Sequence, residues 1–296
     1  MKQFFLLAFS ILAFLNLQAQ DFQGMAVYES KTSTSEFKTR LEGNKDITPE
    51  MRAMAENAMK QMFEKTFILN FDKTSSIYKE EEKLDAPGQG QPGFKMITSM
   101  TGGGGTYYKN VKDKSYVVDK EFMGKEFLVK DTLTTLKWKM ESETKQIGGY
   151  TCFKATAVRP ASKSDIRNFR PKDAKKEDSK TTNQTDGKQK TTSIMEEIEI
   201  PDNVTVTAWY TPEIPVNQGP ENYWGLPGLI LEANDGKTII LCSKIVLNPK
   251  DKAVIKAPTG GKIVTQAEYD EIVLKKMEEL REMQGRNGGM QLRIGQ

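Results

Sequence analysis

Histidine is missing from the sequence, and this absence excludes several common active sites. The 296 residues include no histidine and only two cysteines. Ser-His-Asp and Cys-His catalysis, HExxH metalloproteases and zinc sites with imidazole ligands all need histidine. The composition therefore favours a binding protein, with no cofactor expected, and leaves an enzyme without histidine as the weaker alternative.

Long apolar stretches are also scarce. Hydrophobic residues make up 37% of the chain and the mean hydropathy is -0.57, which is too polar for a protein with many membrane spans. One such stretch, Phe4–Leu17, follows a basic start and precedes Ala19, the residue after which we expect cleavage. Residues 1–19 therefore predict a signal peptide. We expect an exported protein, periplasmic or secreted, with outer-membrane association as an alternative and no transmembrane span after cleavage.

The chain also lacks a strong excess of charge of one sign. It has 43 Lys+Arg against 40 Asp+Glu, a net charge of +3. The excess lies in Arg159–Thr192, which has too few apolar residues to order itself and predicts a mobile insertion. The remaining chain has no basic footprint for nucleic acid. We expect a single domain over residues 20–285, with this insertion, and a flexible tail over 286–296.

Short segments with alternating apolar residues occupy most of the chain. This period-two pattern, interrupted by turn residues, predicts strands. The segments are 26–29, 66–71, 76–78, 106–108, 116–118, 126–129, 136–140, 151–158, 204–210, 229–232 and 238–242. Long helices do not alternate with them, so we expect a mainly β fold with a curved antiparallel sheet or half-barrel.

Two amphipathic helices are expected to pack on this sheet. Thr48–Glu50 is a helix start signal, and a helix to about Lys65 would place Met51, Met59 and Met62 on one face. Thr265–Glu268 has the pattern of a capping box and begins a second helix that would end near residue 285.

Methionines on the first helix allow a second interpretation. Met51 and Met54, like Met59 and Met62, are one helical turn apart, and thioethers are soft ligands for Cu(I). Methionine is also a common gap filler between a helix and a sheet. We favour core packing and keep Cu(I) handling as the alternative function.

Both cysteines, Cys152 and Cys242, stand in strand segments. In an oxidising compartment they could form a disulfide, worth about 4–5 kcal/mol in the chain-entropy model. Two buried reduced thiols are the equal alternative. Neither is expected to be catalytic, because no histidine is present to activate a thiol.

The most distinctive segment lies between residues 208 and 232. Within it, Leu226–Leu229 predicts a type II turn with a positive φ at Gly228, while Gly225 would permit a close backbone approach. The residues proposed for the aromatic rim of an apolar site are Trp209, Tyr223, Trp224 and Leu226. A structural corner is the alternative interpretation.

Residues Gly225, Leu226, Pro227, Gly228, Leu229 and Ile230 spell GLPGLI, and the chain resembles the GLPGLI family of exported proteins from Bacteroidetes-type bacteria. The resemblance extends upstream and covers most of Trp138–Glu232. Because that family's function is uncharacterised, the resemblance implies export but no activity. The architecture looks similar to the lipoprotein-carrier half-barrel (LolA/LolB-like). Thr132, in Asp-Thr-Leu, fits the O-glycosylation pattern of such bacteria and is a candidate site.

These observations favour an exported, non-enzymatic protein. Its curved sheet would bind an apolar ligand, either a lipid or a peptide, or an outer-membrane partner such as a transporter. Fold-level similarity does not identify that ligand.

Overall fold

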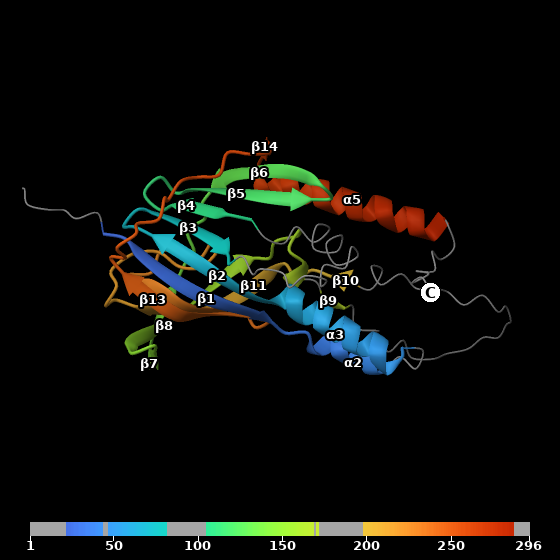
Figure 1. Cartoon of the computed structure of the whole chain (residues 1–296), viewed down its shortest axis with the longest axis horizontal. Helices are drawn as coiled ribbons and strands as arrows, with labels where there is room; N and C mark the ends of the chain where they lie inside the picture. The colour runs from blue at the N-terminus through green and yellow to red at the C-terminus, as the bar shows by residue number, and fades with distance from the viewer. Residues whose placement is uncertain (1–21, 44–46, 82–104, 169, 172–197, 287–296) are drawn as a thin grey trace, which may run out of the picture.

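The computed structural model describes residues 22–43, 47–81, 105–168, 170–171 and 198–286 (Figure 1). The predicted signal peptide, residues 169 and 172–192 of the predicted insertion and residues 287–296 of the predicted tail lie outside this part.

One large curved sheet dominates the described residues, and the predicted mainly β fold is confirmed. It has 12 strands in the order β14-β6-β5-β4-β3-β2-β1-β13-β12-β11-β8-β7 (Figure 1). The strands are β1 (Gly24–Thr32), β2 (Glu64–Phe71), β3 (Ser75–Glu80), β4 (Tyr107–Asn110), β5 (Ser115–Phe122), β6 (Lys125–Thr132), β7 (Lys139–Ile147), β8 (Tyr150–Pro160), β11 (Asn203–Thr211), β12 (Leu229–Asn234), β13 (Thr238–Leu247) and β14 (Lys262–Val264). A separate pair joins β9 (Arg170–Pro171) to β10 (Ile198–Glu199).

Most pairs in the large sheet join consecutive strands, but β1 pairs with β13, β8 with β11 and β14 with β6. Neighbouring strands of the large sheet pair antiparallel, except that β14 pairs parallel to β6 at one edge. Strand β7 forms the other edge, and the sheet stays open. One predicted strand began too early: Leu136–Trp138 lie before β7, which starts at Lys139.

Alternation of side chains builds the core on the inner face of the sheet. In β1, Ala26 and Tyr28 are buried while their neighbours are not, as the period-two pattern predicts. The main core cluster joins β1, β2, β3, β8 and β11–β13. A second cluster lies where Tyr269 and Val273 of α5 (Gln266–Arg286) pack on β5 and β6. The helix begins at the predicted capping box, since Thr265 and Glu268 bond reciprocally at 2.7 and 3.2 Å.

The other predicted helix forms but does not pack as expected. Thr48 caps α3 (Pro49–Phe63) by accepting a bond from the Met51 amide at 3.2 Å, and a further helix, α2 (Ser35–Gly43), precedes it. No residue of α3 is buried, because it continues outward from β2 and does not lie across the sheet (Figure 1). The prediction that its methionines pack in the core is therefore wrong.

The predicted insertion also starts too early. Arg159 and Pro160 complete β8, and the following residues include a turn of 3₁₀ helix, η1 (Ile166–Asn168). Arg159, Ser164 and Asn168 are buried. Ion pairs and hydrogen bonds order this polar segment where apolar burial does not. Among the described residues, no helix is long and apolar enough to span a membrane.

Candidate functional site

A cleft of about 550 Å³ opens on the inner face of the sheet between β1 and β6. One side is the sheet itself, and the other sides are the arginine loop (residues 161–168, after β8), Glu221 and the first turns of α5. The cleft thus lies between the two core clusters. We regard it as the candidate binding site.

Aromatic rings form the floor of the cleft because alternate residues of β2–β5 face inward. Tyr78 of β3 lies opposite Tyr107 of β4 in the strand register. The rings of Phe67 and Tyr78 stack with centroids 4.7 Å apart, and those of Tyr107 and Tyr116 stack at 5.3 Å. These rings give the cleft an apolar floor, in which Phe67, Tyr107 and Tyr116 are half-buried and Tyr78 is 3% exposed.

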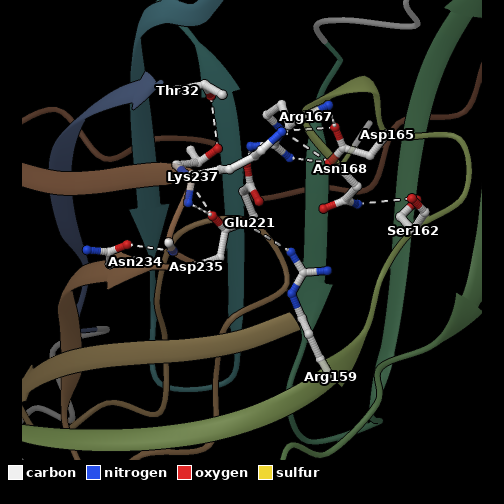
Figure 2. A network of polar contacts seen from close by, with 12 residues as sticks. Thr32, Arg159, Ser162, Asp165, Arg167, Asn168, Glu221, Asn234, Asp235 and Lys237 are labelled. Carbon is white, nitrogen blue, oxygen red and sulfur yellow. Dashed lines mark hydrogen bonds and ion pairs between the residues drawn. The ribbon is translucent and has the colours of Figure 1, made fainter. Parts of the chain in front are cut away.

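Arg167 organises the opposite, polar wall. Its guanidinium bonds Asp165 through NH2 at 2.7 Å and Glu221 through NH1 at 2.6 Å, and Figure 2 shows it between the two carboxylates. Burial acts to raise the pKa of Asp165, but the Arg167 charge and hydrogen bonds outweigh it and hold that pKa below its usual value. Asp165 is therefore a carboxylate and an acceptor at neutral pH.

Glu221 reaches this wall from the glycine loop (residues 212–228, between β11 and β12). Its φ is 47°, in the left-handed region that few residues other than glycine adopt. Such strain persists only where surrounding contacts fix it, and it often marks functional sites.

Lys109 supplies those contacts. Its fully buried ammonium donates to the carbonyl oxygens of Gly219, Glu221 and Tyr223, at 2.5, 2.8 and 3.1 Å. Burial lowers the pKa of Lys109 to about 7. The lysine therefore braces the glycine loop from beneath and positions the Glu221 carboxylate.

Two buried polar atoms of residues that line the cleft have no hydrogen-bond partner among the described residues: Tyr78 Oη and Arg159 Nε. Tyr78 is 3% exposed and Arg159 is 8% exposed. The Arg159 guanidinium lies 3.7 Å from Asp235 (Figure 2). It also lies over the Tyr223 ring, 5.7 Å from the centroid. An unpaired buried polar atom costs about 1–3 kcal/mol, so a ligand that pairs with these atoms would recover part of that cost.

Helix α5 closes the third side of the cleft. Asp270 accepts from Ser164 of the arginine loop at 2.5 Å and from Gln266 at 2.7 Å. The Lys120 ammonium lies 4.6 Å above the ring of Tyr269, and burial lowers its pKa. These contacts tie the helix to both the sheet and the arginine loop.

The residues predicted as an apolar rim do not line this cleft. Tyr223, Trp224 and Leu226 are only 2%, 6% and 0% exposed, so they belong to the interior. Trp209 is partly exposed elsewhere, with the Lys145 ammonium 4.3 Å over its ring. The rim interpretation is wrong because the glycine loop folds inward and its aromatic side chains complete the core.

The two predicted glycine roles in the motif are reversed. Gly225, not Gly228, has the positive φ, at 91°. A Cβ at Gly228 would lie 2.1 Å from the Thr211 carbonyl oxygen, so this glycine is the one that permits close backbone approach. The Gly228 amide bonds the Leu226 carbonyl at 2.8 Å, which closes a three-residue turn around Pro227 where a type II turn was expected.

The same motif fixes the neighbouring strands. Leu229 and Ile230 are fully buried, and their amides bond the carbonyls of Ile214 and Gln218, both at 3.0 Å. The indole of Trp224 donates to the Thr134 carbonyl, and that of Trp138 donates to the Trp224 carbonyl, each at 2.9 Å. The alternative interpretation, a structural corner, describes this segment correctly.

Cys152 and Cys242 are both free and buried, so of the two alternatives the structure has reduced thiols. Burial raises the pKa of Cys152 to about 11 and that of Cys242 to about 12. The thiols therefore act as small apolar side chains of the main core cluster.

Among the predicted site residues, Thr132 and Met62 line the cleft. Thr132, the O-glycosylation candidate, is exposed at the end of β6, where it lines the cleft. Met51 and Met54 are 47% and 54% exposed, while Met59 and Met62 are half-buried. Among the described residues, no group of three or more His, Cys, Asp or Glu side chains is arranged to hold a metal ion.

Sequence reasoning missed most of the polar wall. Arg167 and Asp165 fell in a segment assigned to mobility, and Glu221 stood beside a more conspicuous motif. One signal was available for Lys109: it continues the inward alternation of Tyr107, so a lysine stands where an apolar residue is expected.

Comparison with known proteins gives a family match without a function. Residues 138–232 match the model of a family described as "Protein of unknown function (Porph_ging)". This segment contains β7, β8, β11, the glycine loop and the start of β12, and it excludes the aromatic floor. No curated protein matches the chain.

Two solved structures of PNGF-II, in space groups C2 and P21, resemble the chain. Both are 14% identical and cover 86% of this chain, with TM-scores of 0.44 and 0.43. The chain spans only 33% of PNGF-II.

Proposed function

We propose that this chain is an exported, non-enzymatic protein that holds a small amphipathic ligand in the cleft between the aromatic floor and the Arg167 wall. The observation that carries the proposal is the pair of buried atoms without partners, Tyr78 Oη and Arg159 Nε, both from residues that line the cleft. A pocket lined by apolar rings with a few convergent polar groups is the usual form of a ligand site.

Binding accounts for this wall better than catalysis does. General acid catalysis at neutral pH needs a carboxyl with a raised pKa, whereas Arg167 lowers the pKa of Asp165. All three guanidinium nitrogens of Arg167 are engaged by Asp165 and Glu221. The arrangement is a fixed surface of donors and acceptors.

Export and the identity of the family form part of this proposal. Residues 1–19 have the sequence of a signal peptide, and Gly225–Ile230 has the GLPGLI spelling, which is compatible with the match over 138–232. An outer-membrane transporter is the partner class we favour. Intact-mass analysis of the exported product, with a mature start at Gln20, would test the first point.

Native mass spectrometry can test the binding function. We expect the full chain, expressed with residues 1–19 and purified gently from the periplasm, to carry a noncovalent adduct. Thr134 lines the cleft and Thr135 does not, although both are exposed. Thr134→Trp should therefore block the cleft and remove the adduct, while Thr135→Trp retains it.

The opposite results would contradict the proposal. Binding of equal strength in both tryptophan variants would place the ligand elsewhere. The absence of any adduct, together with no binding of added palmitate or neutral disaccharides, would exclude a ligand-binding role for the cleft.

Cu(I) handling by α3 is a second candidate, favoured by the exposure of Met51 and Met54 on a helix with no buried residue. We expect a Met51→Leu, Met54→Leu variant to lose Cu(I) in competition with bicinchoninate. Met140, which is 57% exposed on β7, provides the matched control Met140→Leu. Unchanged affinity in the double variant would end this candidate.

A further inference from the structure

The cleft is balanced in charge, and this limits the kind of ligand it can hold. Its lining includes the cations Lys65, Lys120, Arg159 and Arg167, and the anions Asp131, Asp165, Glu221 and Asp270. A charged ligand placed among them would meet as many like charges as opposite ones. The balance therefore favours a neutral ligand.

The polar wall offers both donors and acceptors to that ligand. Tyr78 Oη and Arg159 Nε are without partners among the described residues. On the acceptor side, Glu221 uses Oε1 to bind Arg167, and Asp270 uses Oδ1 to bind Ser164 and Gln266. An ionised carboxylate has several acceptor sites, so each of these two side chains can accept a further hydrogen bond from a ligand.

A purely apolar ligand does not fit this wall. It would exclude water from the carboxylates and from Lys120 without replacing the lost hydrogen bonds, and it would leave Tyr78 Oη and Arg159 Nε unpaired. Burial of polar groups without partners is unfavourable. The ligand must supply polar atoms along one side and an apolar face along the other.

We infer that the cleft binds a neutral saccharide, with a ring face against the stacked aromatic pairs and hydroxyl groups toward Arg159, Glu221 and Asp270. Each sugar hydroxyl both donates and accepts, which matches the mixture of groups on the wall. The C–H face of a sugar ring supplies an apolar surface that can pack on the half-buried rings of Phe67, Tyr107 and Tyr116. The volume of about 550 Å³ is in the range of small-molecule sites. This inference rests on the proposed function and names its ligand class.

Titration of the mature chain with defined probes tests the inference. The probes are maltose, lactose, chitobiose and mannobiose as neutral saccharides, and palmitate as a single-chain lipid. We expect at least one disaccharide to bind, by calorimetry and by saturation-transfer NMR. Tyr78→Phe removes the unpartnered hydroxyl and should weaken that binding roughly tenfold, the equivalent of one neutral hydrogen bond.

Tyr108→Phe is the matched control, because Tyr108 is on the adjacent strand and does not line the cleft. It should leave saccharide affinity unchanged, and thermal melts of both variants will show that they fold. Binding of palmitate but of no saccharide would overturn this inference and leave the proposed function standing. Failure of all probes, with no copurifying ligand, would overturn both. Equal weakening by the two tyrosine variants would overturn the placement in the cleft.

Discussion

The glycine loop and the arginine loop both close onto the same sheet, but they are held in different ways. The glycine loop buries Ile214, Val216 and Leu226 in the main core cluster and makes close backbone contacts at Gly228. The arginine loop buries Ser164 and Asn168 and is held by ion pairs and side-chain hydrogen bonds. Apolar packing and close backbone contact thus determine the conformation of the glycine loop, and ion pairs and polar contacts determine that of the arginine loop. The recognisable motif belongs to the glycine loop, whereas the arginine loop contributes more polar residues to the lining of the cleft.

Substitution of Gly228 gives the largest effect we expect. A Cβ in Gly228→Ala would lie 2.1 Å from the Thr211 carbonyl oxygen, and backbone cannot move aside cheaply. We expect the free energy of unfolding to fall by about 3 kcal/mol in urea denaturation. Gly236→Ala is the control, because Gly236 has a φ of 86° but nothing within 4 Å of its Cβ position, and it should cost only about 1 kcal/mol. Equal losses of stability in the two variants would show that the close backbone contact at Gly228 does not determine the conformation of the glycine loop.

Substitution of Lys109 should have the second-largest effect on stability. Lys109→Met leaves the Gly219, Glu221 and Tyr223 carbonyls without their buried donor, so we expect a loss of about 2 kcal/mol in stability. Saccharide binding should weaken as well, because Glu221 loses its support. Lys112→Met, an exposed lysine just after β4, should change neither property. A Lys109 variant of unchanged stability would contradict the brace.

The same lysine predicts a pH dependence with a definite sign. Burial lowers the folded-state pKa of Lys109 to about 7 from an unfolded value of 10.5. Between these values the unfolded chain binds more protons, so the free energy of unfolding should rise with pH, by an amount on the order of 2 kcal/mol between about pH 7 and pH 9. Urea denaturation across this window should show the rise in the wild type relative to Lys109→Met. Parallel pH profiles would contradict it.

Substitution within the arginine loop should have a smaller effect on stability and a larger one on the cleft. Arg167→Met removes the guanidinium ion pairs of Asp165 and Glu221, and because these groups are partly exposed we expect a cost of about 1.5 kcal/mol. Without Arg167 the pKa of Asp165 should rise, which NMR titration of its carboxyl can measure. Lys163→Met, at an exposed position of the same loop, should leave that pKa unchanged.

Trp224 provides the smallest expected effect. Trp224→Phe keeps most of the buried ring but removes the bond from its indole to the Thr134 carbonyl, which should cost about 1 kcal/mol. Trp209→Phe, at the partly exposed indole, should cost less. The reverse order in thermal melts would restore Trp209 as the more important aromatic residue of this segment.

The sequence predicted the mainly β fold because period-two alternation is a local signal that the inner face of one sheet must satisfy. It also predicted both helix starts, since Thr48 and Thr265 bond residues only three positions away. The glycine roles were not predictable, because they depend on where Thr211 lies relative to Gly228 in space. The polar wall was not predictable for the same reason: Arg167 and Glu221 are 54 residues apart, and neither has a local pattern.

The two ends of the open sheet have a consequence for behaviour in solution. An unpaired edge strand invites pairing with another chain, which leads to fibres and aggregates. At one end β14 is only three residues long, and at the other β7 carries Lys139, Glu141, Glu143 and Lys145. A second molecule pairing with β14 could form only a short ladder of backbone hydrogen bonds. Pairing with β7 would require these charged side chains to lose water. Both edge strands are therefore poor templates for pairing with another chain, and we expect concentrated solutions of the folded protein to resist edge-to-edge association.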